Sequence, residues 1–215
     1  MWVHGGMRFP ISKMKLRLLE KGQQNFLLND GLKGTNLLMT RYFELKPPTV
    51  LFMEGFDFGQ NMQPVQSVAI IGAGNMGSGI AQKTAQEEFD VQMVDREAQW
   101  VERGQTIISD FLAEAVERRI FSPEQVEQIK GRITGVVGTE NTASDTDLVI
   151  EAVFEDFDIK SAVFNTLNEV CDESTILASN TSSLSVNELA LASGRPDRFV
   201  GLHFFYHPAN NRLVE

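Results

Sequence analysis

Hydrophobic positions fall into a regular order from about residue 67 to the end of the chain. A β-branched run at residues 67–71 is followed by a helical stretch at 78–88 and by a second apolar run at 91–94 that closes on Asp95. This order predicts a strand, a crossover helix and a second strand parallel to the first, because parallel strands must be joined by a crossover connection.

The same alternation continues through the rest of this region. Apolar positions at helical spacing predict a long helix over residues 99–119. Ser122 and Gln125 can form a capping box, with Pro123 at the first helical position, so a second helix is expected to run to about residue 130. The further elements expected are strands at 133–137, 148–153 and 175–179, a helix at 157–170 and a final strand at 199–204. The pattern predicts an α/β fold: a Rossmann-type doubly wound, mostly parallel sheet with helices on both faces.

Residues 1–66 have a different character. Their short apolar pieces are separated by Gly, Asn and a Pro47-Pro48 pair, and no period persists long enough to predict an element. They hold 8 Lys and Arg against 5 Asp and Glu, net +3, whereas residues 67–215 hold 11 against 24, net −13. We therefore expect residues 1–66 to be a poorly structured N-terminal extension, either disordered or included through a wrongly assigned start codon, ahead of one domain at 67–215.

Composition narrows the classes of function. A formal net charge of −10 disfavours nucleic acid as a partner, because a phosphate backbone would repel the acidic domain. With three histidines and the single Cys171, the chain can form no intramolecular disulfide and has no Cys/His cluster at metal-ligand spacing. No apolar run approaches the roughly 18 residues of a membrane span. We expect a soluble protein of a reducing compartment, cytoplasmic or in the mitochondrial matrix of a eukaryote, without a metal or a membrane partner.

A glycine motif follows the first predicted strand. Gly72 permits a tight turn, Gly74 lets the backbone approach a pyrophosphate, and Gly77 lets the next helix pack on the sheet with its N-terminus toward the phosphates. Asp95 lies 18 residues after Gly77, where its carboxylate can accept hydrogen bonds from ribose hydroxyls and would repel a 2′-phosphate. The motif predicts a dinucleotide site that prefers NAD to NADP. FAD uses the same fingerprint, and the adjacent Arg96 could soften the preference.

Four stretches of the domain carry a more specific pattern. They are residues 68–82 around the glycine motif, 147–156 (DLVIEAVFED), 178–184 (ASNTSSL), and 201–205 (GLHFF) with 213–215 (LVE). The first is shared with many dehydrogenases, whereas the last two in this order and spacing are specific. Together they resemble the nucleotide-binding domain of the L-3-hydroxyacyl-CoA dehydrogenases, NAD-linked enzymes of fatty-acid β-oxidation. The resemblance implies NAD as the cofactor and an acyl-CoA as the substrate.

In the last stretch the resemblance implies a catalytic pair, His203 with Glu215 as its carboxylate partner. Alcohol oxidation needs a base to take the hydroxyl proton as hydride leaves the carbon, and histidine has a suitable pKa. A carboxylate on the other ring nitrogen fixes the tautomer and stabilises the imidazolium. Without the surrounding motif, a structural histidine at a strand end would be the simpler interpretation.

Five further roles follow from the resemblance. Ser182 corresponds to a serine that hydrogen-bonds the substrate oxygen near the nicotinamide, although it could also be a turn or N-cap residue. Glu155 and Lys160 correspond to positions that contact NAD, although they could also form a solvated helix face. Arg118 and Arg119 lie near the place where the family sets basic residues against the CoA phosphates, although both also suit a helix C-terminus.

The segment after His203 departs from the family pattern. Members commonly continue His-Phe-Phe with Asn-Pro, and here Tyr206 occupies the Asn position beside the nicotinamide and substrate. A phenol can still donate a hydrogen bond but is bulkier than an amide, so the range of acyl chains can differ. His207 is a second candidate base, and Asn210 could partly replace the missing amide.

The expected function is the reversible oxidation of a (3S)-3-hydroxyacyl-CoA by NAD. The alternatives are a related dehydrogenase of a free hydroxy acid, similar to gulonate 3-dehydrogenase, and a module that binds NAD without turnover. The resemblance also implies a following helical domain that closes the substrate cleft and forms a homodimer. Because a carboxylate on a terminal residue such as Glu215 would not be held rigidly, we expect this chain alone to bind NAD and turn over acyl-CoA poorly.

A chain that begins at Met62 tests the domain boundary. If residues 1–61 contribute nothing to the domain, the shortened protein will unfold cooperatively in urea and bind NADH with the affinity of the full chain. Fluorescence titration and urea unfolding measure both properties. Loss of the cooperative transition would show that the N-terminal region is part of the folded domain.

Overall fold

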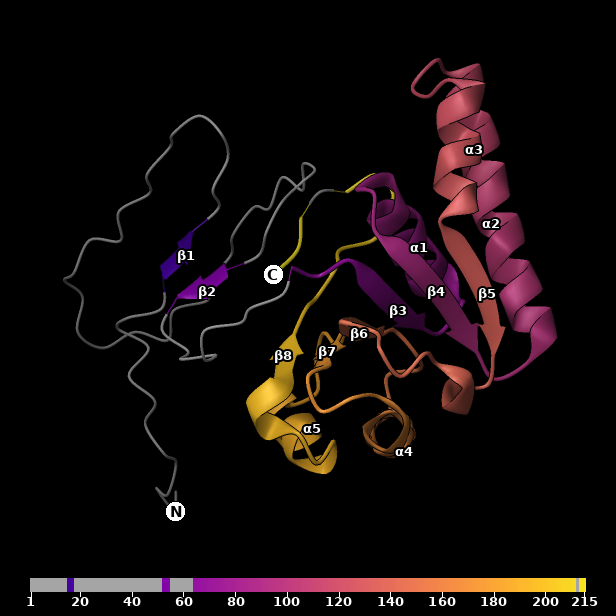
Figure 1. Ribbon diagram of the computed structural model, residues 1–215. Helices are drawn as coiled ribbons and strands as arrows, with labels where there is room; N and C mark the ends of the chain where they lie inside the picture. The colour runs from indigo at the N-terminus through magenta and orange to yellow at the C-terminus, as the bar shows by residue number, and fades with distance from the viewer. Residues whose placement is uncertain (1–14, 18–51, 55–63, 212) are drawn as a thin grey trace. The chain divides into compact units, whose positions relative to one another are not determined.

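The computed structural model describes residues 15–17, 52–54, 64–211 and 213–215 (Figure 1). Two strands in the first part, β1 (Lys15–Arg17) and β2 (Phe52–Glu54), pair antiparallel with Leu16 opposite Met53. The sequence pattern indicated no element there, because a short ladder is made by backbone groups and needs no side-chain period. The rest of the expected N-terminal extension lies outside the described residues.

The domain from residue 67 onward is built on a six-stranded sheet in which every pairing is parallel. Its strands are β3 (Ser67–Ile71), β4 (Asp90–Asp95), β5 (Ile133–Val137), β6 (Leu148–Glu151), β7 (Ile176–Ser179) and β8 (Phe199–Gly201). The spatial order is β5-β4-β3-β6-β7-β8, so the chain grows outward in one direction from β3 and then in the other. This doubly wound order confirms the predicted Rossmann-type fold.

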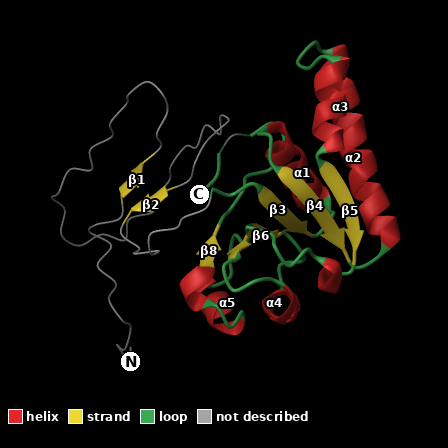
Figure 2. Ribbon diagram, viewed as in Figure 1, coloured by secondary structure: helices red, strands yellow, loops and turns green. Residues whose placement is uncertain are grey.

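Helices cover both faces of the sheet (Figure 2). They are α1 (Asn75–Gln86), α2 (Ala98–Glu117) and α3 (Pro123–Gly131) on one face, and α4 (Phe157–Val170) and α5 (Val186–Ala192) on the other. The Ser122 side chain accepts the Gln125 N–H and the Gln125 side chain accepts the Ser122 N–H, which confirms the capping box. No helix in the described part of the chain is long and apolar enough to cross a bilayer.

Several boundaries differ from the sequence expectation. The strand expected at residues 199–204 ends at Gly201, and Phe204 instead forms an isolated antiparallel bridge with Val214. The strand expected at 148–153 ends at Glu151. Helix α5 and the 3-10 turns η2 (Thr139–Asn141) and η3 (Pro196–Arg198) were not predicted, because they are too short to show a hydrophobic period.

The central strand β3 buries side chains on both of its faces, as a strand inside a parallel sheet must. Ala69 and Ile71 join a core with Phe164 and Leu167 of α4. On the other face, the Cγ2 atom of Ile70 lies beneath α1. The strand order reverses between β3 and its neighbour β6, and in such sheets ligands bind at the carboxyl ends of the strands beside the reversal.

The amino ends of β3 and β6 are joined by one carboxylate. Oδ2 of Asp147 accepts hydrogen bonds from the backbone N–H groups of Gln66 (2.9 Å) and Ser67 (2.8 Å) and from the Ser67 hydroxyl (2.8 Å). Burial raises the pKa of Asp147, but these hydrogen bonds outweigh it and leave the pKa below its usual value. The ionised carboxylate therefore stabilises the register of the two strands.

Asp147→Asn should destabilise the domain in a pH-dependent way. A carboxyl whose pKa is depressed by folding contributes stability above its unfolded pKa of about 4 and loses it as the pH falls through the folded value. We expect a loss of about 1 kcal/mol in unfolding free energy at pH 7, a modest value because the group is half-exposed, and a smaller loss near pH 3. Urea unfolding at both pH values measures the difference. An equal loss of unfolding free energy at both pH values would show that the charge of Asp147 does not contribute to stability.

Candidate active site

The glycine motif forms a tight turn between β3 and α1. Gly72 has a φ of 105°, and a Cβ there would lie 2.7 Å from the Ala152 carbonyl oxygen. A Cβ on Gly77 would lie 1.7 Å from the Gly72 carbonyl oxygen, so no side chain fits. A Cβ on Gly74 would meet no atom within 4 Å, and this residue precedes the first turn of α1 without a side-chain cap. The space above Gly74, beside the helix N-terminus, fits a pyrophosphate.

Asp95 closes the same turn from the end of β4. Its Oδ2 accepts the Ala73 N–H at 2.7 Å, and its Oδ1 accepts the Arg96 N–H at 2.8 Å. Each oxygen keeps a lone pair, so the carboxylate can also accept hydrogen bonds from ribose hydroxyls. The exposed Arg96 side chain pairs with Glu97 at 3.3 Å. The site therefore suits NAD better than NADP.

A pocket of about 330 Å³ opens next to the glycine motif. It is lined by Met76, Ala152, Val153, Glu155, Lys160, Asn180, Ser182, His203, Phe204, Phe205 and Tyr206. A larger hollow of about 730 Å³, around Gly194 and Arg195, contains none of the predicted site residues. The smaller pocket is the candidate site, because it brings five of the predicted residues onto one surface: Glu155, Lys160, Ser182, His203 and Tyr206.

His203 and Glu215 lie side by side as predicted. His203 Nδ1 lies 3.0 Å from Glu215 Oε1. Their backbones exchange two hydrogen bonds, from the His203 N–H to the Glu215 carbonyl (2.8 Å) and from the Glu215 N–H to the His203 carbonyl (3.0 Å). These hydrogen bonds place the Glu215 carboxylate beside the imidazole, and the expectation that it is not held rigidly stays a prediction.

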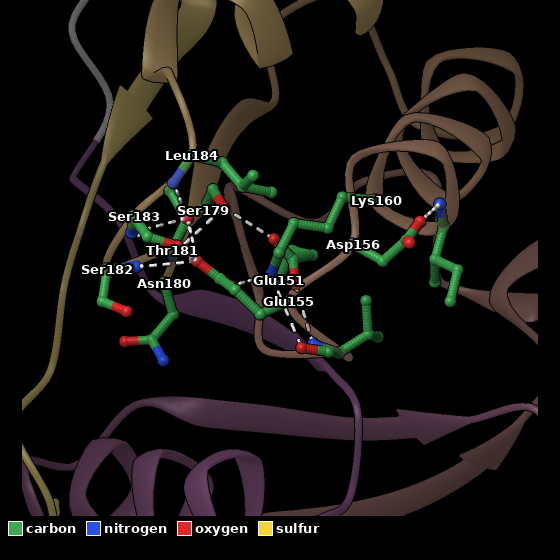
Figure 3. A network of polar contacts seen from close by, with 12 residues as sticks. Glu151, Glu155, Asp156, Lys160, Ser179, Asn180, Thr181, Ser182, Ser183 and Leu184 are labelled. Atoms are coloured by element: carbon green, nitrogen blue, oxygen red, sulfur yellow. Dashed lines mark hydrogen bonds and ion pairs between the residues drawn. The ribbon is translucent and has the colours of Figure 1, made fainter.

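The loop that carries Ser182 is organised by Glu155 (Figure 3). Its Oε1 accepts hydrogen bonds from the Ser182 N–H (3.1 Å), the Ser183 N–H (3.2 Å), the Ser183 hydroxyl (3.0 Å) and the Thr181 hydroxyl. Burial raises the pKa of Glu155, but the Thr181 and Ser183 hydrogen bonds and the Lys160 charge lower it to about 2. Glu155 is therefore ionised near neutral pH, and its Oε1 supports the loop.

Lys160 lies beneath this loop with only 1% of its side chain exposed. Its ammonium lies between Glu151 Oε1 (2.5 Å) and Glu155 Oε2 (3.2 Å). That near-complete burial leaves little surface for direct contact with NAD, although the residue borders the pocket. Sequence reasoning missed Glu151, whose only signal was a single acidic residue in an apolar run, and it missed Asn180, whose Oδ1 accepts the Phe204 N–H at 2.7 Å.

The residues after His203 divide between the pocket and the helices. Tyr206 borders the pocket and is 72% exposed. His207 stacks on Phe111 of α2 with 4.2 Å between ring centroids, and burial lowers its pKa. It is absent from the pocket lining, so the geometry disfavours it as the base. Asn210 is also absent from the lining and donates its N–H to the His207 carbonyl.

Arg118 and Arg119 lie at the C-terminal end of α2, outside the pocket lining. Arg118 pairs with Glu114 one helical turn earlier. Contact of the two arginines with CoA phosphates stays a prediction. No cluster of three or more His, Cys, Asp or Glu side chains that could hold a metal occurs among the residues that the structure describes.

Comparison with known proteins identifies the family of this chain. The family model described as "3-hydroxyacyl-CoA dehydrogenase, NAD binding domain" matches residues 67–215. The chain belongs to the 3-hydroxyacyl-CoA dehydrogenase family. NAD is therefore the cofactor of this domain, which removes the FAD alternative that the glycine motif alone left open. The open space at Gly74 and the acceptor at Asp95 fit that cofactor.

Three relatives of this dehydrogenase-family domain show how much of the chain the likeness covers. A probable 3-hydroxybutyryl-CoA dehydrogenase of Deinococcus radiodurans is 40% identical over 146 residues, 68% of this chain and 52% of that protein. The crystal structure of (S)-3-hydroxybutyryl-CoA dehydrogenase PaaH1 from Ralstonia eutropha is 35% identical with a TM-score of 0.64. This match covers 67% of this chain and 50% of that protein. A diketoreductase structure is 30% identical with a TM-score of 0.65, and the match covers 70% of this chain and 53% of that protein. The chain spans about half the length of the curated relatives it matches.

The dinucleotide preference can be measured directly. Because the Asp95 carboxylate would repel a 2′-phosphate, NADH should bind at least about tenfold more tightly than NADPH in fluorescence titrations. Asp95→Asn should narrow that ratio, since the amide oxygen can keep the Ala73 hydrogen bond without the charge. Asp110→Asn, which neutralises an exposed carboxylate on α2, is the matched control and should leave the ratio unchanged. Tighter binding of NADPH by the unaltered chain would overturn the role of Asp95.

Proposed function

We propose that this protein catalyses the reversible oxidation of a (3S)-3-hydroxyacyl-CoA to the 3-oxoacyl-CoA with NAD. The observation that carries the proposal is the His203–Glu215 pair at a pocket beside the glycine motif. Family membership supports the reaction type, and a relative named 3-hydroxybutyryl-CoA dehydrogenase supports the substrate class.

In the proposed reaction His203 is the general base. A carboxylate can only accept a hydrogen bond, so Glu215 holds the proton of His203 on Nδ1 and leaves Nε2 with its lone pair. The substrate O–H bond breaks as its proton moves to Nε2, and the carbonyl forms as the hydrogen on C3 departs with its electron pair. NAD supplies the hydride acceptor when it is bound. Glu215 stabilises the resulting imidazolium, which returns the proton in the reverse direction.

Ser182 is proposed to hold the substrate oxygen. Figure 3 shows its side chain pointing away from the Glu155 carboxylate, whereas its backbone N–H donates to that carboxylate. The backbone is therefore fixed while the hydroxyl stays available at the pocket wall. A hydrogen bond from Ser182 to the developing carbonyl oxygen would lower the barrier in both directions.

A second candidate substrate is a free hydroxy or dicarbonyl compound. The likeness to a diketoreductase structure named for dicarbonyl compounds favours it, and Arg118 and Arg119 lie outside the pocket lining. Reduction of acetoacetyl-CoA and of acetoacetate, each with NADH at micromolar protein, separates the two substrate classes. Preference for the thioester supports the proposal, and preference for the free acid supports the second candidate. Binding of NADH without reduction of either would identify a binding module.

The base assignment predicts unequal effects of two substitutions. His203→Ala should lower kcat for acetoacetyl-CoA reduction on the order of a thousandfold, because it removes the proton donor and acceptor. Glu215→Gln should cost less, because it disturbs orientation and charge while the base remains. Steady-state absorbance of NADH at micromolar protein, with NADH and acetoacetyl-CoA in excess, measures both values of kcat and resolves slow turnover.

His207→Phe is the matched control for that pair. Phenylalanine can keep the stack on Phe111, and His207 does not line the pocket, so kcat should stay within about threefold of the unaltered chain. Near-normal turnover in His203→Ala together with a large loss in His207→Phe would assign the base to His207 instead.

A further inference from the structure

Among the residues that the structure describes, the most deeply buried charged side chain lies outside the proposed proton transfer. Glu151, the last residue of β6, has no exposed surface. An ionised carboxylate at such a position needs full pairing, because isolated charge is costly to bury. Its Oε1 accepts from Lys160 Nζ (2.5 Å) and the Val153 N–H (2.8 Å), and its Oε2 accepts from the Ser179 hydroxyl (2.6 Å).

Two hydrogen-bonded arms run from Glu151 to the loop that carries Ser182 (Figure 3). In the first arm, Ser179 Oγ accepts the Thr181 N–H at 3.2 Å. In the second, Lys160 pairs with Glu155, whose other oxygen accepts the Ser182 N–H. The arms leave different oxygens of one carboxylate and reach adjacent residues, so the loop is held at two points.

The backbone of Glu151 also reaches the His203 side of the pocket. Its carbonyl accepts the Asn180 N–H at 2.8 Å, and Asn180 Oδ1 accepts the N–H of Phe204, the residue after His203, at 2.7 Å. Hydrogen bonds therefore connect the end of β6 to Ser182 on one wall of the pocket and to Phe204 on the other.

We propose that Glu151 is a positioning residue that fixes Ser182 relative to His203 through its two side-chain arms. The expected effect on catalysis rests on the proposed function. The expected effect on the order of the loop rests only on the contacts described above. A displacement of reacting groups by about 1 Å can cost on the order of a hundredfold in rate, so loss of this support should lower kcat more than it weakens NADH binding.

Glu151→Gln is the direct test, because it keeps the shape of the side chain and removes the charge that holds Lys160. The first readout is amide hydrogen exchange, followed by mass spectrometry, in peptides spanning residues 179–184. We expect exchange there to become about tenfold faster. Wild-type exchange in the 179–184 peptides of a folded Glu151→Gln protein would overturn the proposal.

The second readout is kinetic and uses a double-mutant cycle. With acetoacetyl-CoA and NADH, Glu151→Gln should lower kcat by about tenfold to a hundredfold and change the KM for acetoacetyl-CoA by less than about threefold. In a Ser182→Ala background the same substitution should cost only about twofold, because the group that it positions is gone. Equal costs in both backgrounds would show that Glu151 does not act through Ser182.

Thr175→Val is the matched control for a general loss of stability. Thr175 is buried just before β7, at the opposite end of that strand from Ser179, and its hydroxyl donates to the Thr146 carbonyl at 2.7 Å. The variant should unfold at lower urea concentration and still show wild-type exchange at residues 179–184 and kcat within about twofold. If Thr175→Val also exchanges faster at residues 179–184, the effect of Glu151→Gln reflects a lower stability of the whole domain, and the proposal is contradicted.

Ser179→Ala keeps the proposal testable if Glu151→Gln does not fold. It removes one arm and leaves the Glu151–Lys160 ion pair, so exchange at residues 179–184 should rise by about threefold. Unchanged exchange in this variant would then overturn the proposal. If the unaltered chain reduces neither test substrate, the proposed function fails, whereas the exchange measurements still decide the role of Glu151 in the loop.

Discussion

The buried carboxylate of Glu151 is the constraint on which the site depends. Removing a partner from a buried ion pair typically costs about 3–5 kcal/mol, so the positions of Lys160 on α4 and Ser179 on β7 are tied to that of β6. The apolar contacts of Phe164 and Leu167 bring the same helix onto the same sheet. The polar network and the hydrophobic core therefore specify one position of α4 against the sheet. The pocket forms where the polar network meets the surface.

The two halves of the site use different parts of the chain. The cofactor half relies on backbone: glycines at 72 and 77 that admit no side chain, an open position at Gly74, and one carboxylate, Asp95, that ties the turn to β4. The proposed substrate half relies on side chains from the loop after β7 and from the final segment. A backbone cradle tolerates variation in the surrounding sequence, whereas a side-chain constellation requires particular residues at particular distances.

The final segment shows how a short stretch outside the sheet is held in place. Phe204 and Val214 pair as an isolated bridge, and the hydrogen bonds around them hold His203 opposite Glu215. Asn180 ties this segment to the loop after β7, while the stacking of His207 on Phe111 anchors it to α2. Sequence reasoning treated the twelve-residue spacing of His203 and Glu215 as a family feature, and the structure supplies the antiparallel pairing that accounts for it.

The sequence by itself determined the strands of the parallel sheet, the longer helices, the capping box and the glycine turn, because each of these is encoded by neighbouring residues through periodicity, cap chemistry or backbone freedom. Only the tertiary structure decided which polar groups meet around Glu151 and where His207 lies. From the sequence, Glu151 was one residue of an apolar strand, Lys160 a contact of NAD or an exposed helix residue, and His207 a second candidate base. Their roles depend on partners 9 to 96 residues away, such as Lys160 for Glu151 and Phe111 for His207. Contacts at that separation arise only when the chain packs, so no local pattern records them.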